Sequence, residues 1–314
     1  MNLNKKIIDV GIITFNHENF IEQCIESVYE QTISDNMRVI VIDDASTDNT
    51  SGILKQLNKA YPFHLIQHDK NKGIIQSAYA YASLLESPFF CWLDGDDYWK
   101  YKDKLKVQIK FLENNPQYSA CFHDAIIKQE NATEDKNLNR TQFTFNLYSQ
   151  FNHYKQEILP QDLINRTILP TSSVVYRKKN IPRNFWDLQT LPYSLSWKLH
   201  LEYIKNSKFY YFNQPWSVYR DHPGGFSKET SLKTFKFHHI EYLLQMLQDN
   251  DFKNYRYNIY KSIVHEYEQI LWASEHESLN KKEWAAAFYG LKKYDKLFMR
   301  EKLKLFKNLK KNKT

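Results

Sequence analysis

Residues 89–97, FFCWLDGDD, decide how this chain is interpreted. The first five residues form an apolar run typical of a buried strand, and three carboxylates, Asp94, Asp96 and Asp97, follow at once. Carboxylates this close repel one another and are costly to remove from water, so a cation is expected among them. Hard oxygen ligands suit Mg²⁺ or Mn²⁺, which commonly bridge a diphosphate. Taken alone, the stretch fits an acidic turn equally well, because Asp and Gly are ordinary turn residues.

The chain before this stretch alternates between strand and helix patterns. Short apolar strands are expected at residues 7–14, 39–42, 63–68 and 89–93. Apolar residues at helical spacing lie between them, near residues 20–28, 53–57 and 75–85. Short apolar strands joined by helices imply an α/β fold with a mainly parallel sheet covered on both faces.

Polar residues follow three of these expected strands. They are Thr14-Phe15-Asn16, Asp43-Asp44 and Asp94 to Asp97. In sheets of this kind, ligands bind outside the carboxyl ends of the strands. Three polar clusters at one edge therefore favour a binding site over an isolated acidic turn.

The ordered motifs resemble those of glycosyltransferase family 2. They are TFN at residues 14–16, VIDDASTDNT at 41–50, NKG at 71–73 and LDGDDYW at 93–99. Four motifs in this order are a more specific signal than any one of them. The resemblance covers residues 5–125, and residues 155–228 more loosely. It implies a GT-A (Rossmann-like) fold and an enzyme that transfers a sugar, with inversion, from a nucleotide diphosphate sugar such as a UDP-sugar.

The resemblance also implies roles for single residues. Asp94 and Asp96 would hold Mg²⁺ or Mn²⁺, and His222 would be a further ligand, although a lone histidine in a loop is commonly a surface residue. The residues implied to bind the nucleotide are Thr14, Phe15, Asn16, Asp43, Asp44, Asp94 and Arg220. Phe15 would lie against the base, and Asp44 would accept a hydrogen bond from a base N–H. Asp43 is equally compatible with a helix-capping role.

The resemblance implies that the general base is a carboxylate directly before a tryptophan, but Ser196 precedes Trp197 here. Serine cannot act as a base at neutral pH without help. Asp187 and His200 are the nearest titratable candidates. The alternative is a non-catalytic relative that binds a nucleotide sugar or a glycan within an assembly complex. A dinucleotide dehydrogenase is disfavoured, because no G-x-G-x-x-G follows the first strand.

Residues 1–230 are expected to form the transferase domain, with a nucleotide-binding half at 1–125 and an acceptor-side half at 126–230. Later elements are expected as strands at 118–122, 170–178 and 209–212, a helix at 195–204 and a polar excursion at 128–157. Residues 231–314 are expected to form a C-terminal helical appendage. The acceptor would be a glycan or a lipid-linked glycan, in bacterial surface polysaccharide synthesis.

The end of the chain is strongly basic. Residues 292–314 hold ten Lys or Arg and two acidic residues, whereas the whole chain has a net charge of +7. Tyr294, Leu297 and Phe298 fall near one face of an expected helix. A basic amphipathic helix suits an anionic membrane surface, and the alternative is a solvated charged tail. Nucleic acid is not expected as a partner, because no recognition module surrounds the tail.

Composition favours a cytoplasmic protein, peripheral on the inner face of the cell membrane. Its three cysteines, Cys24, Cys91 and Cys121, lack paired spacing, which suits a reducing compartment. No apolar run reaches the roughly 18 residues that a membrane span requires. Asp9 interrupts the first apolar run, so no signal peptide is expected.

Overall fold

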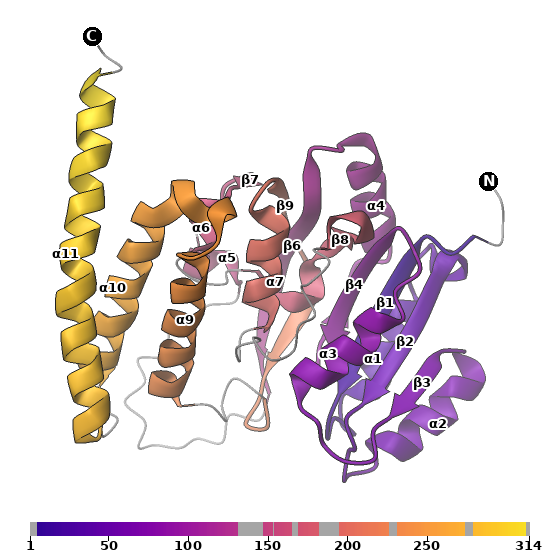
Figure 1. Ribbon diagram of the computed structural model, residues 1–314. Helices are drawn as coiled ribbons and strands as arrows, with labels where there is room; N and C mark the ends of the chain where they lie inside the picture. The colour runs from indigo at the N-terminus through magenta and orange to yellow at the C-terminus, as the bar shows by residue number, and fades with distance from the viewer. Residues whose placement is uncertain are drawn as a thin grey trace. The chain divides into compact units, whose positions relative to one another are not determined.

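The structure is a computed structural model that describes residues 5–130, 147–152, 154–164, 169–181, 195–225, 231–273 and 279–311. The chain divides into two compact units. The first comprises Met1–Ile158, Ile168–Thr190 and Glu202–Pro223, and the second comprises Leu159–Thr167, Leu191–Leu201 and Gly224–Thr314. The first contains a sheet with helices, and the second is helical (Figure 1). Two short segments before residue 224 belong to the second unit, so the division is not a single cut along the sequence.

The first unit is built on a mixed sheet with nine strands in the described part of the chain. They are β1 (Ile8–Thr14), β2 (Met37–Asp43), β3 (His64–Gln67), β4 (Phe89–Asp94), β5 (Tyr98–Trp99), β6 (Tyr118–Gln129), β7 (Glu157–Ile158), β8 (Val175–Arg177) and β9 (Lys208–Asp221). Their order is β3-β2-β1-β4-β8-β6-β9-β5, and β7 also pairs with β9. Strands β1 to β4 run parallel, as do β6 and β9, whereas β5, β7 and β8 pair antiparallel with their neighbours. The predicted mainly parallel α/β sheet is confirmed.

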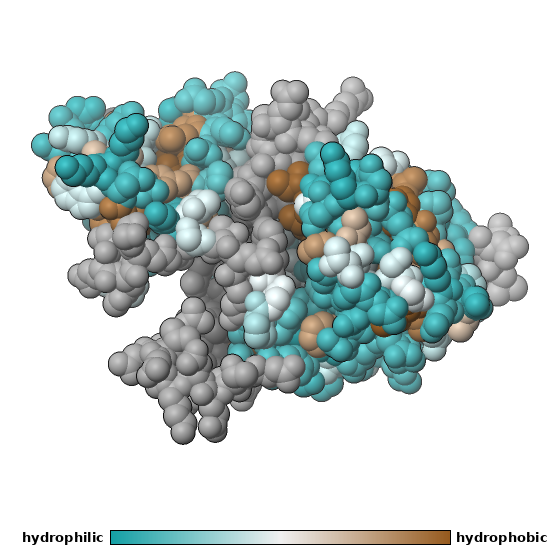
Figure 2. All heavy atoms as spheres, turned by 90° about the horizontal axis from the view of Figure 1, so that it is seen from below, coloured by the Kyte–Doolittle hydropathy of each residue, from teal (hydrophilic) through white to brown (hydrophobic). Residues whose placement is uncertain are grey.

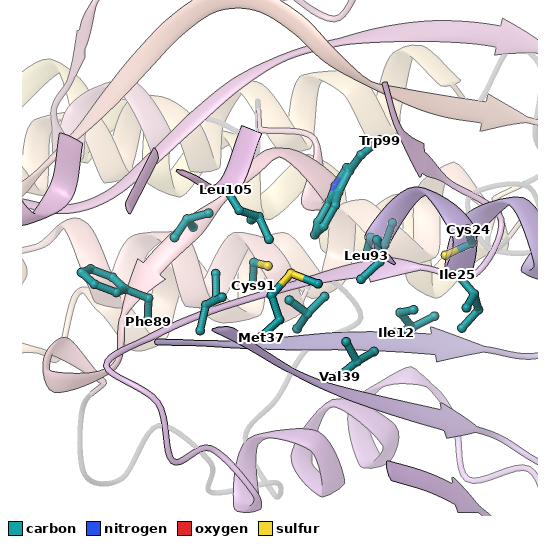
Figure 3. Close-up of a cluster of buried hydrophobic side chains, with 14 of the residues drawn as sticks. Ile12, Cys24, Ile25, Met37, Val39, Phe89, Cys91, Leu93, Trp99 and Leu105 are labelled. Carbon is teal, nitrogen blue, oxygen red and sulfur yellow. The ribbon is translucent and has the colours of Figure 1, made fainter. Parts of the chain in front are cut away.

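Helices cover this sheet and close its core. They are α1 (Ile21–Tyr29), α2 (Thr50–Ala60), α3 (Ile74–Ser83), α4 (Lys104–Asn114) and the short α5 (Ser149–Asn152). Ile12 and Val39 of the strands, Cys24 and Ile25 of α1, and Leu105 of α4 belong to one buried cluster (Figure 3). Because this core anchors the strands, their carboxyl ends are held in fixed positions.

Two predicted strands are longer in the structure, and one is shorter. The strands expected at 118–122 and 209–212 extend as β6 and β9, which pair parallel over their lengths with irregular register around His123 and Asp124. His123 and Asp124 therefore lie inside a strand instead of following it. In the stretch 170–178, only Val175–Arg177 is a strand, because Thr171–Ser173 forms a 3-10 turn in which Ser173 Oγ donates to the Pro170 carbonyl at 2.7 Å.

The second unit contains the C-terminal helices predicted after residue 231, namely α9 (Leu232–Met246), a 3-10 segment (Asn250–Tyr255), α10 (Arg256–Ala273) and α11 (Lys281–Lys311). It also contains α6 (Pro160–Leu163) and most of α7 (Leu195–Ile204), which come from the part of the chain expected as the acceptor-side half. The buried Trp197 indole donates to the Leu163 carbonyl at 2.6 Å, and its ring lies 4.5 Å from that of His239. These contacts tie α7 to α6 and α9.

Within the described ranges, no helix combines the length and apolar character needed to cross a membrane.

Candidate functional site

The carboxyl ends of β1, β2 and β4 meet at one edge of the sheet, as the sequence predicted. Thr14 pairs with Asp43, and Ile13 pairs with Asp94. Gly95 lies so close to the end of β1 that an added Cβ would stand 2.7 Å from Thr14 Oγ1. A side chain at this position would push the acidic loop away, so glycine is needed to bring the loop against β1.

Three side chains from distant parts of the chain form a candidate metal centre at this edge. They are His17 after β1, Asp96 between β4 and β5, and His222 directly after β9. The Asp96 carboxylate lies 2.9 Å from His222 Nε2 and 3.8 Å from His17 Nε2. All three potential ligand atoms lie within 4.8 Å of one another, a spacing that one divalent cation can bridge.

The donor set of this centre consists of two imidazole nitrogens and one carboxylate oxygen. Imidazole suits transition metals, whereas Mg²⁺ strongly prefers oxygen, so the residues fit Mn²⁺ better than Mg²⁺. Asp96 and His222 were expected as ligands, and His17 was not. Its sequence signal is weak, namely a histidine three residues beyond the Thr that ends β1. Asp94, also expected as a ligand, is not among the three residues of this group.

The three carboxylates of the acidic loop are not equivalent. Burial, together with the charge of Asp96, raises the pKa of Asp94 to about 7. Burial and the charges of Asp96 and Asp94 raise the pKa of Asp97 well above its ordinary value. Burial also opposes ionisation of Asp96, but the hydrogen bond from His222 and the charges of His17 and His222 outweigh it and lower the pKa of Asp96. Negative charge is therefore concentrated on Asp96, where a cation would be held.

His17 is oriented by its neighbours. Burial lowers the pKa of His17, although the nearby Asp96 favours the charged form. Its Nδ1 lies 3.2 Å from Thr14 Oγ1, and its Nε2 faces Asp96. A neutral imidazole with one nitrogen engaged by the protein and the other directed into the site is the usual form of a histidine ligand.

Arg220 is buried among protein groups. Its guanidinium lies 4.5 Å from the ring of Tyr98 and 5.0 Å from that of Phe20. The Nε–H donates to Glu130 at 3.1 Å, and the other nitrogens donate to Gln23 and to the Asp96 carbonyl. These bonds hold the loop that carries Asp96. They use three of the five guanidinium N–H groups, so the expected phosphate contact stays a prediction.

Asp44 lies at the predicted strand end but is well enclosed. Its Oδ1 accepts from His68 Nδ1 at 2.7 Å and from the Lys72 N–H at 2.9 Å, and its Oδ2 accepts from the Gly73 N–H at 2.7 Å. Asp44 therefore fastens the 71–73 turn to the end of β2. Asp43 accepts from the Ser46 N–H at 3.0 Å and from Gln67 Nε2 at 3.2 Å, so it fixes the loop after β2 and does not cap α2, whose N-cap residue is Asn49.

Thr14, Phe15 and Asn16 line the end of β1. Thr14 is buried, whereas Phe15 is 37% exposed, so the Phe15 ring is open to a ligand. The Asn16 side-chain oxygen accepts from the Thr47 N–H at 2.7 Å, and the Asn16 backbone N–H donates to Ser46 Oγ at 2.9 Å. Asn16 therefore joins the loop after β1 to the loop after β2.

The described residues place neither of the two candidate general bases at this edge. Asp187 lies outside the described residues. His200 has no exposed surface, and burial lowers its pKa to about 3. A ring without access to solvent cannot take a proton from an incoming hydroxyl, so His200 is removed as a candidate base. The sequence pointed to His200 only because it lies near Trp197, and nearness along a helix does not place a side chain on the open face.

Comparison with known proteins gives a family match over more than half of the chain. The family described as glycosyl transferase family 2 matches residues 9–184. An uncharacterised protein of Mycobacterium tuberculosis is 26% identical over 217 residues, which cover 68% of this chain and 58% of that protein. The chain thus spans less than two thirds of that relative. A putative teichuronic acid biosynthesis glycosyltransferase of Bacillus subtilis, TuaG, is 25% identical over 172 residues, which cover 54% of this chain and 62% of that protein.

Solved structures share the fold at low sequence identity. Residues 1–349 of S. aureus TarS, in complex with UDP-GlcNAc, match with a TM-score of 0.65 and 15% identity over 92% of this chain and 80% of that one. The mannosyltransferase PcManGT from Pyrobaculum calidifontis, in complex with GDP-Man and Mn²⁺, matches with a TM-score of 0.56 and 14% identity over 94% of this chain and 84% of that one. These likenesses support the predicted GT-A fold.

Proposed function

Since the chain belongs to glycosyl transferase family 2, we propose that it transfers a sugar from a UDP-sugar to a glycan or lipid-linked acceptor, with inversion, in the synthesis of a bacterial surface polysaccharide. The observation that carries this proposal is the meeting of Asp96, His17 and His222 at the carboxyl edge of the sheet. TuaG is described as a teichuronic acid glycosyltransferase, and TarS was solved with UDP-GlcNAc, so both relatives agree with this substrate class.

The metal dependence follows from the donor set. Asp96, His17 and His222 would hold Mn²⁺, or Mg²⁺ less favourably. The bound cation would neutralise the negative charge of the diphosphate as its bond to the sugar breaks. The structure of PcManGT contains Mn²⁺, in agreement with this choice. Asp94 stands beside this centre, where its carboxylate would accept from the ribose hydroxyls or from a metal-bound water. Arg220 would keep the Asp96 loop in place while the donor binds.

The base and ribose would lie at the ends of β1 and β2. The exposed ring of Phe15 offers a flat apolar surface for uracil. Asp44 Oδ2 accepts one hydrogen bond within the protein, from the Gly73 N–H, and a carboxylate oxygen can accept a second one, here from a base N–H. Asn16 and Asp43 would then act by shaping the loops that surround the base.

The acceptor hydroxyl must lose its proton as it attacks the sugar. Inversion requires a base on the face of the sugar opposite the leaving diphosphate. With Ser196 in place of the expected carboxylate and His200 buried, we assign this role to Asp187. The same two observations favour a second candidate function, in which the chain binds a nucleotide sugar or a glycan without transferring it.

A panel of nucleotide sugars, assayed for turnover with Mn²⁺ and with EDTA, tests the proposal. We expect turnover of at least one UDP-sugar with Mn²⁺ and none with EDTA, and calorimetry should show UDP binding that weakens sharply when the metal is removed. Asp187→Asn should lower transfer at least a hundredfold while leaving UDP affinity nearly unchanged. UDP binding without turnover of any donor would favour the second candidate function. UDP affinity that is indifferent to EDTA would overturn the role of the metal.

The proposed acceptor indicates a location for the protein in the cell. A lipid-linked glycan is held at a membrane, and the basic residues of 292–314 would draw the protein to an anionic surface. We therefore propose a cytoplasmic enzyme that is peripheral on the inner face of the cell membrane.

A further inference from the structure

The apolar face of α11 that the sequence offered to a membrane is used inside the protein. Tyr294 is buried, and its ring lies 6.1 Å from that of Tyr267 on α10. The ring of Phe298 lies 5.2 Å from that of Tyr257 on the same helix. At Gly290, an added Cβ would stand 2.3 Å from the Tyr267 ring. A larger residue at this position would therefore push α11 away from α10. This face is therefore not available to lipid.

The opposite face of α11 carries large apolar side chains that are exposed. They are Trp284 (48% exposed), Phe288 (42%), Tyr289 (68%), Met299 (44%) and Leu303 (58%). Nine large apolar residues are exposed in the described part of the chain, so this one helix holds more than half of them. Pale and brown side chains lie between teal ones on the C-terminal helices at the left of Figure 2. Such a concentration of apolar surface marks a contact site rather than ordinary solvent exposure.

Cationic side chains alternate with these apolar ones. Six of them are exposed on α11: Lys281, Lys282, Lys292, Lys293, Lys296 and Arg300. Asp295 is the one exposed acidic residue of α11 between residues 281 and 303. The positions 281, 284, 288, 292, 296, 299 and 303 recur every three or four residues, so they form one stripe along the helix. Charge and apolar surface are therefore mixed on a single face about six turns long.

We propose that this face, defined by residues 281–303 and called the α11 outer face, docks on a bilayer of anionic phospholipid, with α11 lying along its surface. Tryptophan and tyrosine prefer the headgroup level of a bilayer, and lysine can keep its amine at the phosphates while its stem lies beside apolar chains. A protein partner with an apolar groove would instead have to accommodate six cations. The inference deepens the proposed function by naming the surface that brings the enzyme to a lipid-linked acceptor.

Sedimentation of the full-length protein with two kinds of vesicle tests the α11 outer face. One kind is phosphatidylcholine alone, and the other contains roughly one-third phosphatidylglycerol. We expect binding to the anionic vesicles only. Lys292→Gln/Lys296→Gln should weaken the partition coefficient at least tenfold at low salt, and the matched pair Lys55→Gln/Lys59→Gln on α2, also exposed and four residues apart, should leave it unchanged. Trp284→Gln/Phe288→Gln should weaken it at least tenfold, at low and high salt alike, because the apolar contribution is not screened.

The outcomes separate this inference from the proposed function. Vesicle binding that is equal in wild type and in either α11 pair, or equal on neutral and anionic vesicles, would overturn it. A wild type that ignores vesicles and dimerises, with dimers lost in Trp284→Gln/Phe288→Gln, would assign the face to a second copy of this chain. UDP binding with Mn²⁺ serves as the separate readout, since we expect it to be unchanged in both α11 pairs. Failure of UDP binding in the wild type would count against the proposed function alone.

Discussion

Carboxylates at the two ends of this sheet have opposite surroundings. Asp9, near the start of β1, has no exposed surface and accepts from Arg38 Nε at 2.9 Å, from the Ser87 N–H and hydroxyl at 2.8 Å each, and from the Glu86 N–H at 2.6 Å. Burial opposes its ionisation, but these hydrogen bonds outweigh burial and lower the pKa of Asp9. Its charge is fully compensated within the protein.

At the other end of the sheet, the acidic loop is not compensated in this way. Asp94 and Asp97 lie beside Asp96, and their pKa values are raised by burial and by the neighbouring negative charges. Asp9 is surrounded by donors, whereas Asp97 accepts from the Arg220 N–H and Asp96 from His222, and each carboxylate of the loop remains beside the charge of another. The difference between Asp9 and the acidic loop is thus a physical reason to place the chemistry at the carboxyl edge.

The largest effect is expected at Asp96, in the acidic loop. Asp96→Ala removes the single oxygen ligand of the metal centre, so sugar transfer should fall at least a thousandfold, a loss of about 4 kcal/mol in transition-state binding. Thermal unfolding should shift little, because the loss of the hydrogen bond to His222 is offset by the loss of repulsion with Asp94 and Asp97. Asp69→Ala, at an exposed carboxylate, is the matched control for both measurements. Transfer at the wild-type rate would dismiss the metal centre.

The opposite outcome is expected at Asp9. Asp9→Ala leaves Arg38, Glu86 and Ser87 without their acceptor, and the free energy of unfolding in urea should fall by about 3 kcal/mol. Because the folded pKa is lowered, this contribution is present above the unfolded value near 3.9 and is lost as pH falls below it. UDP affinity of the folded fraction should match the wild type. A stability equal to that of the wild type would remove the distinction between the two groups.

The two histidines sharpen the comparison, because one was expected from the sequence and the other was not. His17→Gln and His222→Gln should each weaken Mn²⁺ binding by tenfold or more, since even outer contacts of metal ligands are typically worth about tenfold to a hundredfold. Calorimetric titration of the protein with Mn²⁺ in the presence of UDP measures both. His238→Gln, on the exposed side of α9, is the control. Unchanged affinity in His17→Gln would reduce the centre to Asp96 and His222.

The smallest effect is expected at Asp94 in metal-free protein. Its folded pKa of about 7 lies above the unfolded value, so the folded state loses stability as pH rises from about 4 to 7. Asp94→Asn cannot ionise and should unfold at a higher temperature than the wild type at pH 8, with no difference near pH 4. Scanning calorimetry in EDTA measures this. A variant that is less stable than the wild type at pH 8 would show that the Asp94 charge is compensated after all.

Much of the fold and part of the site could be predicted from the sequence. The strand and helix periods of residues 7–94 specify the parallel part of the sheet, and they place the polar ends of β1, β2 and β4 at one edge. These patterns are local, since each arises from side chains a few residues apart that share a face. The acidic loop could be identified for the same reason, because its three carboxylates are neighbours in the chain.

Contacts between distant residues were decided only by the tertiary structure. His17 and His222 stand 205 positions apart and meet at Asp96 because β1 and β9 end at the same edge of the sheet. Arg220 is held by Phe20 and Tyr98, and His200 is buried, for reasons that no local pattern contains. The sequence of α11 likewise offers two apolar faces, and packing against α10 decides which one stays exposed. Short-range periodicity determines which elements form, but the pairing of those elements determines which side chains meet.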